Sequence, residues 1–189
     1  MAEEGAARGP GRPARLSADA IVAAAVEHGT GQLTVRGLAR RLGVAHSALY
    51  RWVGDRDGLL DLISDSLLDR VSSQITGEAA GNWRGWLTNL GHALRREFLP
   101  VADAEVLAKF PRTTPVYDRL QQRAETVMTK DGLSAVQASE SFTVFLFTVW
   151  GWIAAEKACG EGLDHDSHFT AMLTALTRGL PAAPDQQAT

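Results

Sequence analysis

The stretch TVRGLARRLGVAHSALYRWVGDRDGLL, residues 34–60, decides the fold of the N-terminal part of this chain. Its first apolar residues fall at positions 35, 38, 39 and 42, a helical spacing that predicts one buried face of a helix. Thr34 precedes them and predicts an N-cap, because its hydroxyl can accept a hydrogen bond from an unpaired backbone N–H. Gly43 follows them, where a left-handed residue ends a helix at little steric cost. Residues 45–53 predict a second helix, so the stretch is typical of two helices joined by a glycine turn.

A second helix held in this way is the arrangement that enters the major groove of DNA. The side chains that the helical pattern leaves outside are cationic or can donate hydrogen bonds: Arg36, Arg40, Arg41, His46, Ser47, Tyr50 and Arg51. Residues 8–56 hold eight arginines and three acidic residues, although the formal net charge of the chain is −3. Because a basic segment on an acidic body favours phosphate contact by one end only, the sequence predicts a DNA-reading head.

The segment LARRLGVAHSALYRWVGDRDGLL resembles the DNA-binding domain of tetracycline-repressor-type (TetR-family) transcriptional regulators. The family pattern is a threonine-capped helix, Leu-Ala-x-x-Leu-Gly-Val, a short variable patch and Leu-Tyr. It is matched in order and spacing by Thr34, Leu38, Ala39, Leu42, Gly43, Val44, Leu49 and Tyr50. Trp52 stands where the family more often has His, Tyr or Phe, and Arg56 stands where it usually has Lys. Both departures keep the aromatic or cationic character of the position.

The resemblance implies an all-α fold, with an N-terminal three-helix helix-turn-helix domain and a C-terminal helical ligand-binding and dimerisation domain. We expect a disordered basic arm over residues 1–15, the helix-turn-helix domain over 16–60, the effector-binding and dimerisation domain over 61–180, and a disordered tail over 181–189. Arm and tail are expected from their polar, Gly-, Ala- and Pro-rich composition. Apolar periodicity, prolines and glycines predict helices over 17–28, 57–76, 83–98, 103–110 and 115–130, a long one from 134, and a last one over 167–179.

The predicted DNA contacts fall into two main sets. Hydroxyl, phenol and guanidinium groups donate to phosphate oxygens, and short side chains at the start of a recognition helix meet base edges. The phosphate set is Thr34, Tyr50 and Arg56, and the base set is Ala45, His46 and Ser47.

Four further residues complete the predicted DNA contacts. The resemblance implies that Arg36 reaches a guanine, and Arg51 lies on the same exposed surface. Trp52 either touches the DNA backbone or is buried beneath the second helix. Arg12, which is followed by Pro13, is typical of arms that enter the minor groove, although an inert linker has a similar composition.

The helix that starts at Ser134 has a centre, FTVFLFTVWGWIAA, that is apolar on nearly every side. Such a helix must be covered on all sides. We therefore predict that one face packs in the core of its own subunit and that the other face packs against a second subunit. The resemblance likewise implies that the last two long helices form a four-helix dimer interface. Two recognition helices related by a twofold axis read an inverted repeat. We therefore expect a homodimer on a palindromic DNA operator.

The resemblance also implies a small-molecule pocket in the C-terminal domain. Large apolar residues with few charges among them favour an apolar or aromatic effector, although each of them can equally be plain core. His92 is a possible polar anchor, and the alternative is an exposed or hydrogen-bonded histidine without a ligand. The candidate pocket residues are Trp86, Leu90, His92, Phe110, Phe142, Phe145 and Trp150.

Other classes of protein find little support in the sequence. Cys159 is the single cysteine, which excludes an intrachain disulfide and suits a reducing compartment. The N-terminus lacks the apolar core of a signal peptide, and the apolar run 142–155 is shorter than a membrane span. We therefore expect a cytoplasmic protein without a membrane partner.

Residues 164–168 contain Asp and His side chains that could bind a metal, but their place before a helix favours capping. No nucleophile elbow, P-loop or dinucleotide motif is present in the sequence. We expect no cofactor, no metal and no enzyme activity. The predicted function is a repressor that an effector releases from its operator, and the alternative is an architectural or ligand-independent DNA-binding protein.

Overall fold

A computed structural model describes residues 16–28, 34–75, 82–101, 114–159 and 164–181 of the 189-residue chain. These residues form α-helices and one short 3-10 turn, and the described ranges contain no strand. The expected all-α fold is confirmed. The predictions for the arm, for a helix over 103–110, for most of the tail, and for Arg12 and Phe110 lie outside the described residues.

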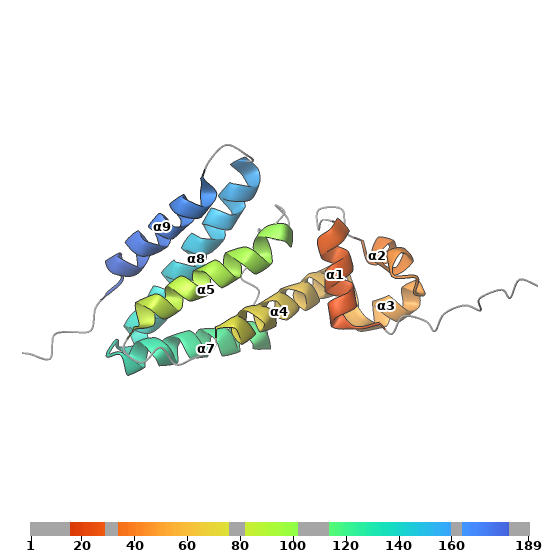
Figure 1. The fold of residues 1–189 in the computed structure, drawn as a ribbon. Coiled ribbons are helices and arrows are strands. Elements are labelled where there is room, and N and C mark those ends of the chain that lie inside the picture. The colour runs from red at the N-terminus through yellow and green to blue at the C-terminus, as the bar shows by residue number, and fades with distance from the viewer. Residues whose placement is uncertain (1–15, 29–33, 76–81, 102–113, 160–163, 182–189) are drawn as a thin grey trace, which may run out of the picture.

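The head consists of three short helices at one end of the molecule (Figure 1). They are α1 (Ala18–His28), α2 (Val35–Arg41) and α3 (His46–Val53). The Thr34 hydroxyl accepts a hydrogen bond from the Gly37 backbone N–H at 3.0 Å, and Gly43 has a φ of 64°. The predicted cap and the predicted glycine turn are therefore both confirmed. Leu38 and Leu49 are buried between the helices.

Helix α4 (Arg56–Gln74) joins the head to the rest of the chain. The Asp55 carboxylate accepts a hydrogen bond from the Gly58 N–H at 2.8 Å, so α4 starts one residue before the expected position 57. A side chain at Gly58 would lie 1.9 Å from the Val53 carbonyl oxygen, so the tight approach of α3 and α4 requires glycine there. Helix α4 packs on α1 and α3 of the head and on α5 and α7 of the body.

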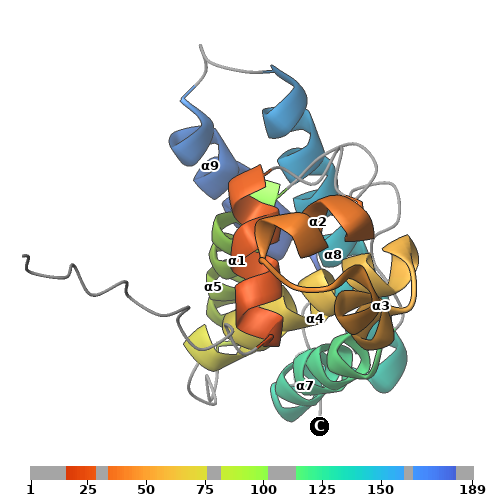
Figure 2. The same ribbon diagram turned by 90° about the vertical axis from the view of Figure 1, so that its right-hand side faces the viewer.

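The body is a bundle of longer helices, which lies behind the head in Figure 2. Its elements are α5 (Trp83–Phe98), the 3-10 turn η1 (Leu99–Val101), α7 (Pro115–Lys130), α8 (Ala135–Cys159) and α9 (His165–Gly179). Helix α8 begins with a reciprocal capping box, because Ser134 N–H donates to Gln137 at 3.0 Å and Gln137 N–H donates to Ser134 at 3.2 Å. Helix α9 begins two residues before the expected position 167, because the Asp164 side chain caps it.

A continuous apolar core runs from the head into the body. Phe98 of α5 and Trp150 of α8 meet edge to face, with ring centroids 4.8 Å apart. Helices α5 and α9 approach so closely that a side chain at Gly91 would lie 2.7 Å from Leu173. Glycine at position 91 therefore allows α9 to pack tightly on α5.

Helix α8 is 25 residues long and, by length and composition alone, long and apolar enough to cross a membrane. The expectation from sequence that no apolar stretch reaches that length is therefore wrong. Core helices of soluble proteins meet the same criterion. In this structure one side of α8, which includes Phe142, Phe145 and Ile153, is buried in the core of the bundle.

Candidate nucleic-acid interface and effector-binding body

Helix α3 presents one apolar and one polar face. Leu49 and Val53 are buried against the rest of the head. The predicted base contacts, Ala45, His46 and Ser47, are all exposed at the start of the helix, as is Arg36 on α2. The structure therefore leaves all the predicted base-reading residues exposed, three of them at the start of α3 and Arg36 on α2.

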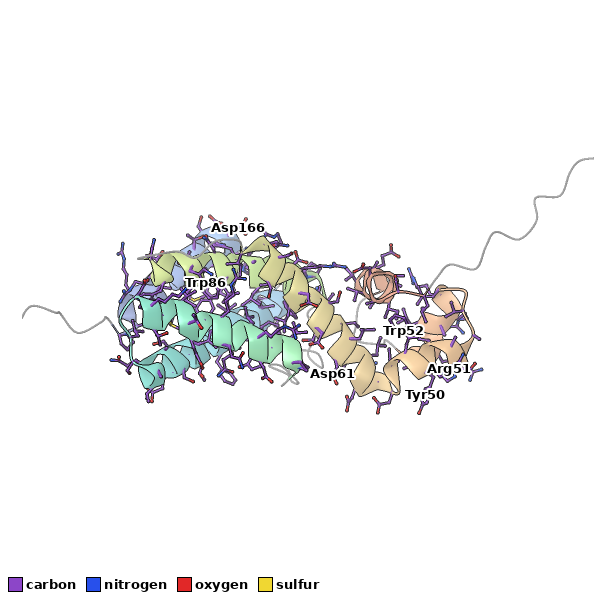
Figure 3. All side chains as sticks on the ribbon, turned by 90° about the horizontal axis from the view of Figure 1, so that it is seen from below. Tyr50, Arg51, Trp52, Asp61, Trp86 and Asp166 are labelled. Carbon is purple, nitrogen blue, oxygen red and sulfur yellow. The ribbon has the colours of Figure 1, made fainter. Side chains whose placement is uncertain are left out.

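Tyr50, Arg51 and Trp52 lie on the head (Figure 3). The exposed fractions of Tyr50 and Trp52 are 52% and 51%, so the prediction that Trp52 is buried beneath α3 is wrong, and its contact with the DNA backbone stays a prediction. The rings of His46 and Tyr50 lie one helical turn apart, with centroids separated by 5.8 Å. This contact supports the Tyr50 ring on the exposed side of α3.

The two remaining phosphate candidates occupy helix N-termini. The Thr34 hydroxyl accepts the capping hydrogen bond of α2, and its own O–H stays available to donate to a phosphate oxygen. Arg56 is the first residue of α4, where the positive end of the helix dipole also favours an anion. Arg41 instead forms an ion pair with Glu27 of α1 at 3.8 Å.

In the body, the predicted effector residues from α5 and α8 belong to one interior cluster. The five buried ones are Trp86, Leu90, Phe142, Phe145 and Trp150. Phe147 resembles them in sequence, but 59% of its surface is exposed, so it does not belong to the interior. Sequence analysis missed Ser64 and Ser141, whose buried hydroxyls have no hydrogen-bond partner among the described residues, like the Trp86 indole N–H. The sequence could have indicated that both serines are buried, because each lies on the buried apolar face of its helix.

His92 lies at the edge of the body instead of inside it. It lines a surface hollow of about 550 Å³ together with Arg95, Arg96, Leu99, Pro100, Asp166 and Thr170. Burial lowers the pKa of His92, and the neighbouring charges of Arg95 and Arg96 lower it further. The ring packs edge to face on Phe169, with centroids 5.4 Å apart. His92 thus makes a packed contact at the edge of the body, and Phe169 joins it to the buried cluster.

Arg95 ties three helices of the body together. Its guanidinium donates to the Glu156 carboxylate of α8 at 2.6 and 2.7 Å, and to Asp166 of α9 at 2.7 Å. The Trp152 indole N–H donates to the same Glu156 at 3.1 Å. The hydrogen bond from Arg95 lowers the pKa of Glu156, and burial opposes it. Glu156 lies 61 residues after Arg95 in the chain, and Asp166 lies 71 residues after it. No local pattern in the sequence therefore indicated these contacts.

The chain is similar in sequence or in structure to several known proteins. The tetracycline repressor protein class D of Escherichia coli is 29% identical over 183 residues, which cover 92% of this chain and 75% of that protein. Mycobacterium smegmatis BioQ matches with a TM-score of 0.71 and 28% identity, over 88% of this chain and 98% of BioQ. The Streptomyces coelicolor TetR family protein ActR, solved with actinorhodin, matches with a TM-score of 0.70 and 23% identity, over 88% of this chain and 97% of ActR.

In sequence and in fold, the chain is therefore similar to TetR-family transcriptional regulators. No model of a known protein family matches it, so the similarity rests on these relatives and on the helix-turn-helix arrangement of the head. Trp52, which stands where the TetR family more often has another aromatic residue or His, is exposed next to Tyr50 in the sequence.

The Asp and His residues before and within α9 serve the fold of the body. Asp164 accepts a hydrogen bond from the Ser167 N–H at 3.1 Å, which lowers the pKa of its carboxyl. His168 Nδ1 lies 2.7 Å from the Asp164 carbonyl oxygen, and Asp166 pairs with Arg95. The described ranges hold no group of three His, Cys, Asp or Glu residues arranged for a metal.

Proposed function

We propose that this protein is a TetR-family regulator, a cytoplasmic homodimeric repressor that occupies an inverted-repeat operator and leaves it when an apolar or aromatic effector binds the body. The observation that carries the DNA-binding part is the exposed surface of α3, where His46, Ser47 and Tyr50 stand clear of a buried apolar face. We assign residues 16–60 to the DNA-binding domain and residues 61–180 to the effector-binding and dimerisation domain.

The DNA contacts follow from the exposed surface of the head. Phosphate contacts come from Thr34, Tyr50 and Arg56, and the exposed side chains of Arg51 and Trp52 extend the same surface. Ala45, His46 and Ser47 read base edges, and Arg36 reaches a guanine with its bidentate guanidinium. Arg12 enters the minor groove from the N-terminal arm.

The dimer contact is supported by an apolar stripe on the outer side of α8. Val136, Val144 and Phe147 are exposed on it, although the opposite side of α8 is core. Gly151 continues the stripe one turn after Phe147, and a side chain there would meet no atom within 4 Å. A large ring next to an open glycine suits a twofold contact, in which Phe147 of each subunit packs over the other subunit's glycine.

The outer side of α9 supports the same dimer. It lines an open groove of about 710 Å³ with the mostly small residues Asp166, Ser167, Thr170, Ala171, Thr174, Ala175 and Arg178. Small residues permit close approach of a second helix. Asp166 and Arg178 stand at opposite ends of α9, so an antiparallel pair of α9 helices would bring opposite charges together.

The effector site is the buried aromatic cluster of the body. Trp86, Leu90, Phe142, Phe145 and Trp150 give it an apolar lining, with Phe110 as a further contact and His92 as a possible polar anchor at its edge. ActR, whose fold this chain shares, was solved with actinorhodin bound. Effector binding swings α4 and changes the separation of the two heads, because effector and DNA favour different head positions.

DNA selection from a random duplex pool tests the proposal. The wild-type protein should select a palindromic sequence, and Tyr50→Ala and Arg36→Ala should lose that sequence or weaken its binding about tenfold or more. Arg119→Ala, which removes an exposed arginine from the body, is the matched control and should select the same sequence as the wild type.

Two outcomes would contradict the proposed regulator. Salt-sensitive binding without a consensus would favour the architectural alternative, since phosphate contacts alone carry no sequence information. A sedimentation or light-scattering mass of one chain, unchanged by Phe147→Asp, would contradict the dimer.

A further inference from the structure

We infer that α7 sets the direction of the connecting helix α4, and with it the position of the head, through two residues, Thr114 and Arg123. The inference rests on the proposed DNA-binding function only for its effect on DNA affinity. The contacts involved form one row between the two helices, here named the α4–α7 seam: Asp65 with Thr114, Asp69 with Arg119, and the carbonyls of Ser72 and Ile75 with Arg123.

The first link joins the start of α7 to the middle of α4. The Thr114 hydroxyl accepts the capping hydrogen bond from the Tyr117 N–H at 3.2 Å and donates to the Asp65 carboxylate at 2.5 Å. Thr114 is buried, and burial raises the pKa of Asp65. Because one hydroxyl both starts α7 and holds α4, the two helices are fixed to each other at this point.

The last link holds the C-terminal end of α4. The Arg123 guanidinium donates to the Ser72 carbonyl at 3.2 Å and to the Ile75 carbonyl at 2.5 Å. Carbonyls at the end of a helix have no partner within it, and a cation there also suits the helix dipole. The Arg123 Cζ lies 5.9 Å from the centre of the Trp86 ring of α5. One side chain of α7 therefore contacts both α4 and a residue of the proposed effector cluster.

The middle link is of a different kind. Arg119 and Asp69 are 3.6 Å apart, and their side chains are 63% and 64% exposed. An exposed ion pair of this kind contributes little, because solvent screens it and both side chains lose freedom. The seam thus holds α4 firmly at two points, with a weak pair between them that provides a natural control.

A helix held at two points has a defined direction. Helix α4 also packs on α1 and α3 of the head, and Figure 3 shows Asp61 on α4 beside the end of α7. Loosening either strong link therefore lets the head occupy further positions. Only part of the population is then competent for DNA, so the apparent Kd rises by the inverse of that fraction.

The direct test measures the distance from head to body. In a Cys159→Ser background, spin labels at Ala23→Cys on α1 and Thr126→Cys on α7 occupy exposed positions. Dilution with excess unlabelled protein restricts the measured distances to one chain. Double electron–electron resonance should give a narrow distribution of label-to-label distances for the wild type and for Arg119→Ala. The distribution should be clearly broader for Arg123→Ala and Thr114→Val.

The second measurement is the Kd of each variant for the operator sequence obtained by DNA selection. Arg123→Ala and Thr114→Val should raise the Kd about fivefold or more, although neither residue is placed near DNA. Arg119→Ala and Thr114→Ser, which keeps the hydroxyl, should stay within about twofold of the wild type. Arg123→Lys keeps the charge and some donor capacity and should give an intermediate result, which provides a milder variant if Arg123→Ala unfolds.

The inference is overturned if Arg123→Ala and Thr114→Val keep the narrow distance distribution of the wild type, or if Arg119→Ala broadens it equally. Failure of the proposed function looks different. In that case the wild type selects no operator, while the head-to-body distances still test the seam.

Discussion

The head and the body are both helical, but their side-chain hydrogen bonds join residues at very different separations along the chain. In the described part of the head, Ser17, Thr34 and Asp55 each accept a hydrogen bond from a backbone N–H three residues further along the chain. In the body, Arg84 donates to the Thr177 carbonyl across 93 residues, and Arg95 donates to Glu156 across 61. Local caps start helices in both regions, but the body also has side-chain hydrogen bonds that span more than 60 residues and form only after folding.

The head and the body also differ in how deeply they bury their proposed functional side chains. The proposed DNA-reading residues are exposed on a small scaffold, so changing them should alter binding more than stability. The proposed effector residues are themselves core, so changing them should alter both. Four substitutions test this contrast, from the largest expected effect on stability to the smallest.

Phe145→Ala should lower the free energy of unfolding by about 3–5 kcal/mol, because it removes a fully buried ring from the body and leaves a cavity. Chemical denaturation followed by circular dichroism measures the loss. Phe147→Ala, two residues along the same helix but exposed, is the matched control and should affect subunit association instead. Equal losses for the two variants at a protein concentration that favours monomer would contradict the described burial.

Glu156→Gln should cost about 2–3 kcal/mol, since it leaves the Arg95 guanidinium without its main charged partner in a partly buried place. The wild type should also respond to acid. The lowered pKa of Glu156 means that its contribution is present above the unfolded pKa and is lost as pH falls through the folded pKa. Urea denaturation at neutral and acidic pH should therefore show the variant's deficit shrinking in acid. A deficit that stays constant with pH would rule out the charge interaction as its source.

Thr34→Ala should destabilise the head by about 1 kcal/mol, because the Gly37 N–H loses its capping acceptor. Hydrogen exchange of α2 amides measures this locally, and amides of α8 should not change. Thr34→Ser, which keeps the hydroxyl, should behave as the wild type. Faster exchange in α8 as well would show that the head and the body do not respond separately.

Trp52→Ala should change the free energy of unfolding by no more than about 0.5 kcal/mol, because the side chain is half exposed on the head. Its effect should appear in operator affinity, measured by fluorescence anisotropy. A loss of stability comparable to that of Phe145→Ala would mean that Trp52 is a core residue.

The same contrast explains which structural features could be predicted from the sequence. The cap at Thr34 and the turn at Gly43 were both predicted, because each depends on residues within a few positions of one another. The start of α9 was missed by two residues because Asp164, and not a residue nearer position 167, supplies the cap. The exposure of Trp52 was left open, since a helix of eight residues does not itself show which of its sides the rest of the head covers.

The sequence by itself determined the all-α class and the helix-turn-helix head, because apolar spacing and capping are local properties of the chain. Only the tertiary structure decided that Arg95 joins Glu156 and Asp166, that Thr114 and Arg123 hold α4, and that Phe147 faces outward while Phe145 is core. These contacts depend on which helix faces lie against each other, and that is settled by packing between segments far apart in the chain.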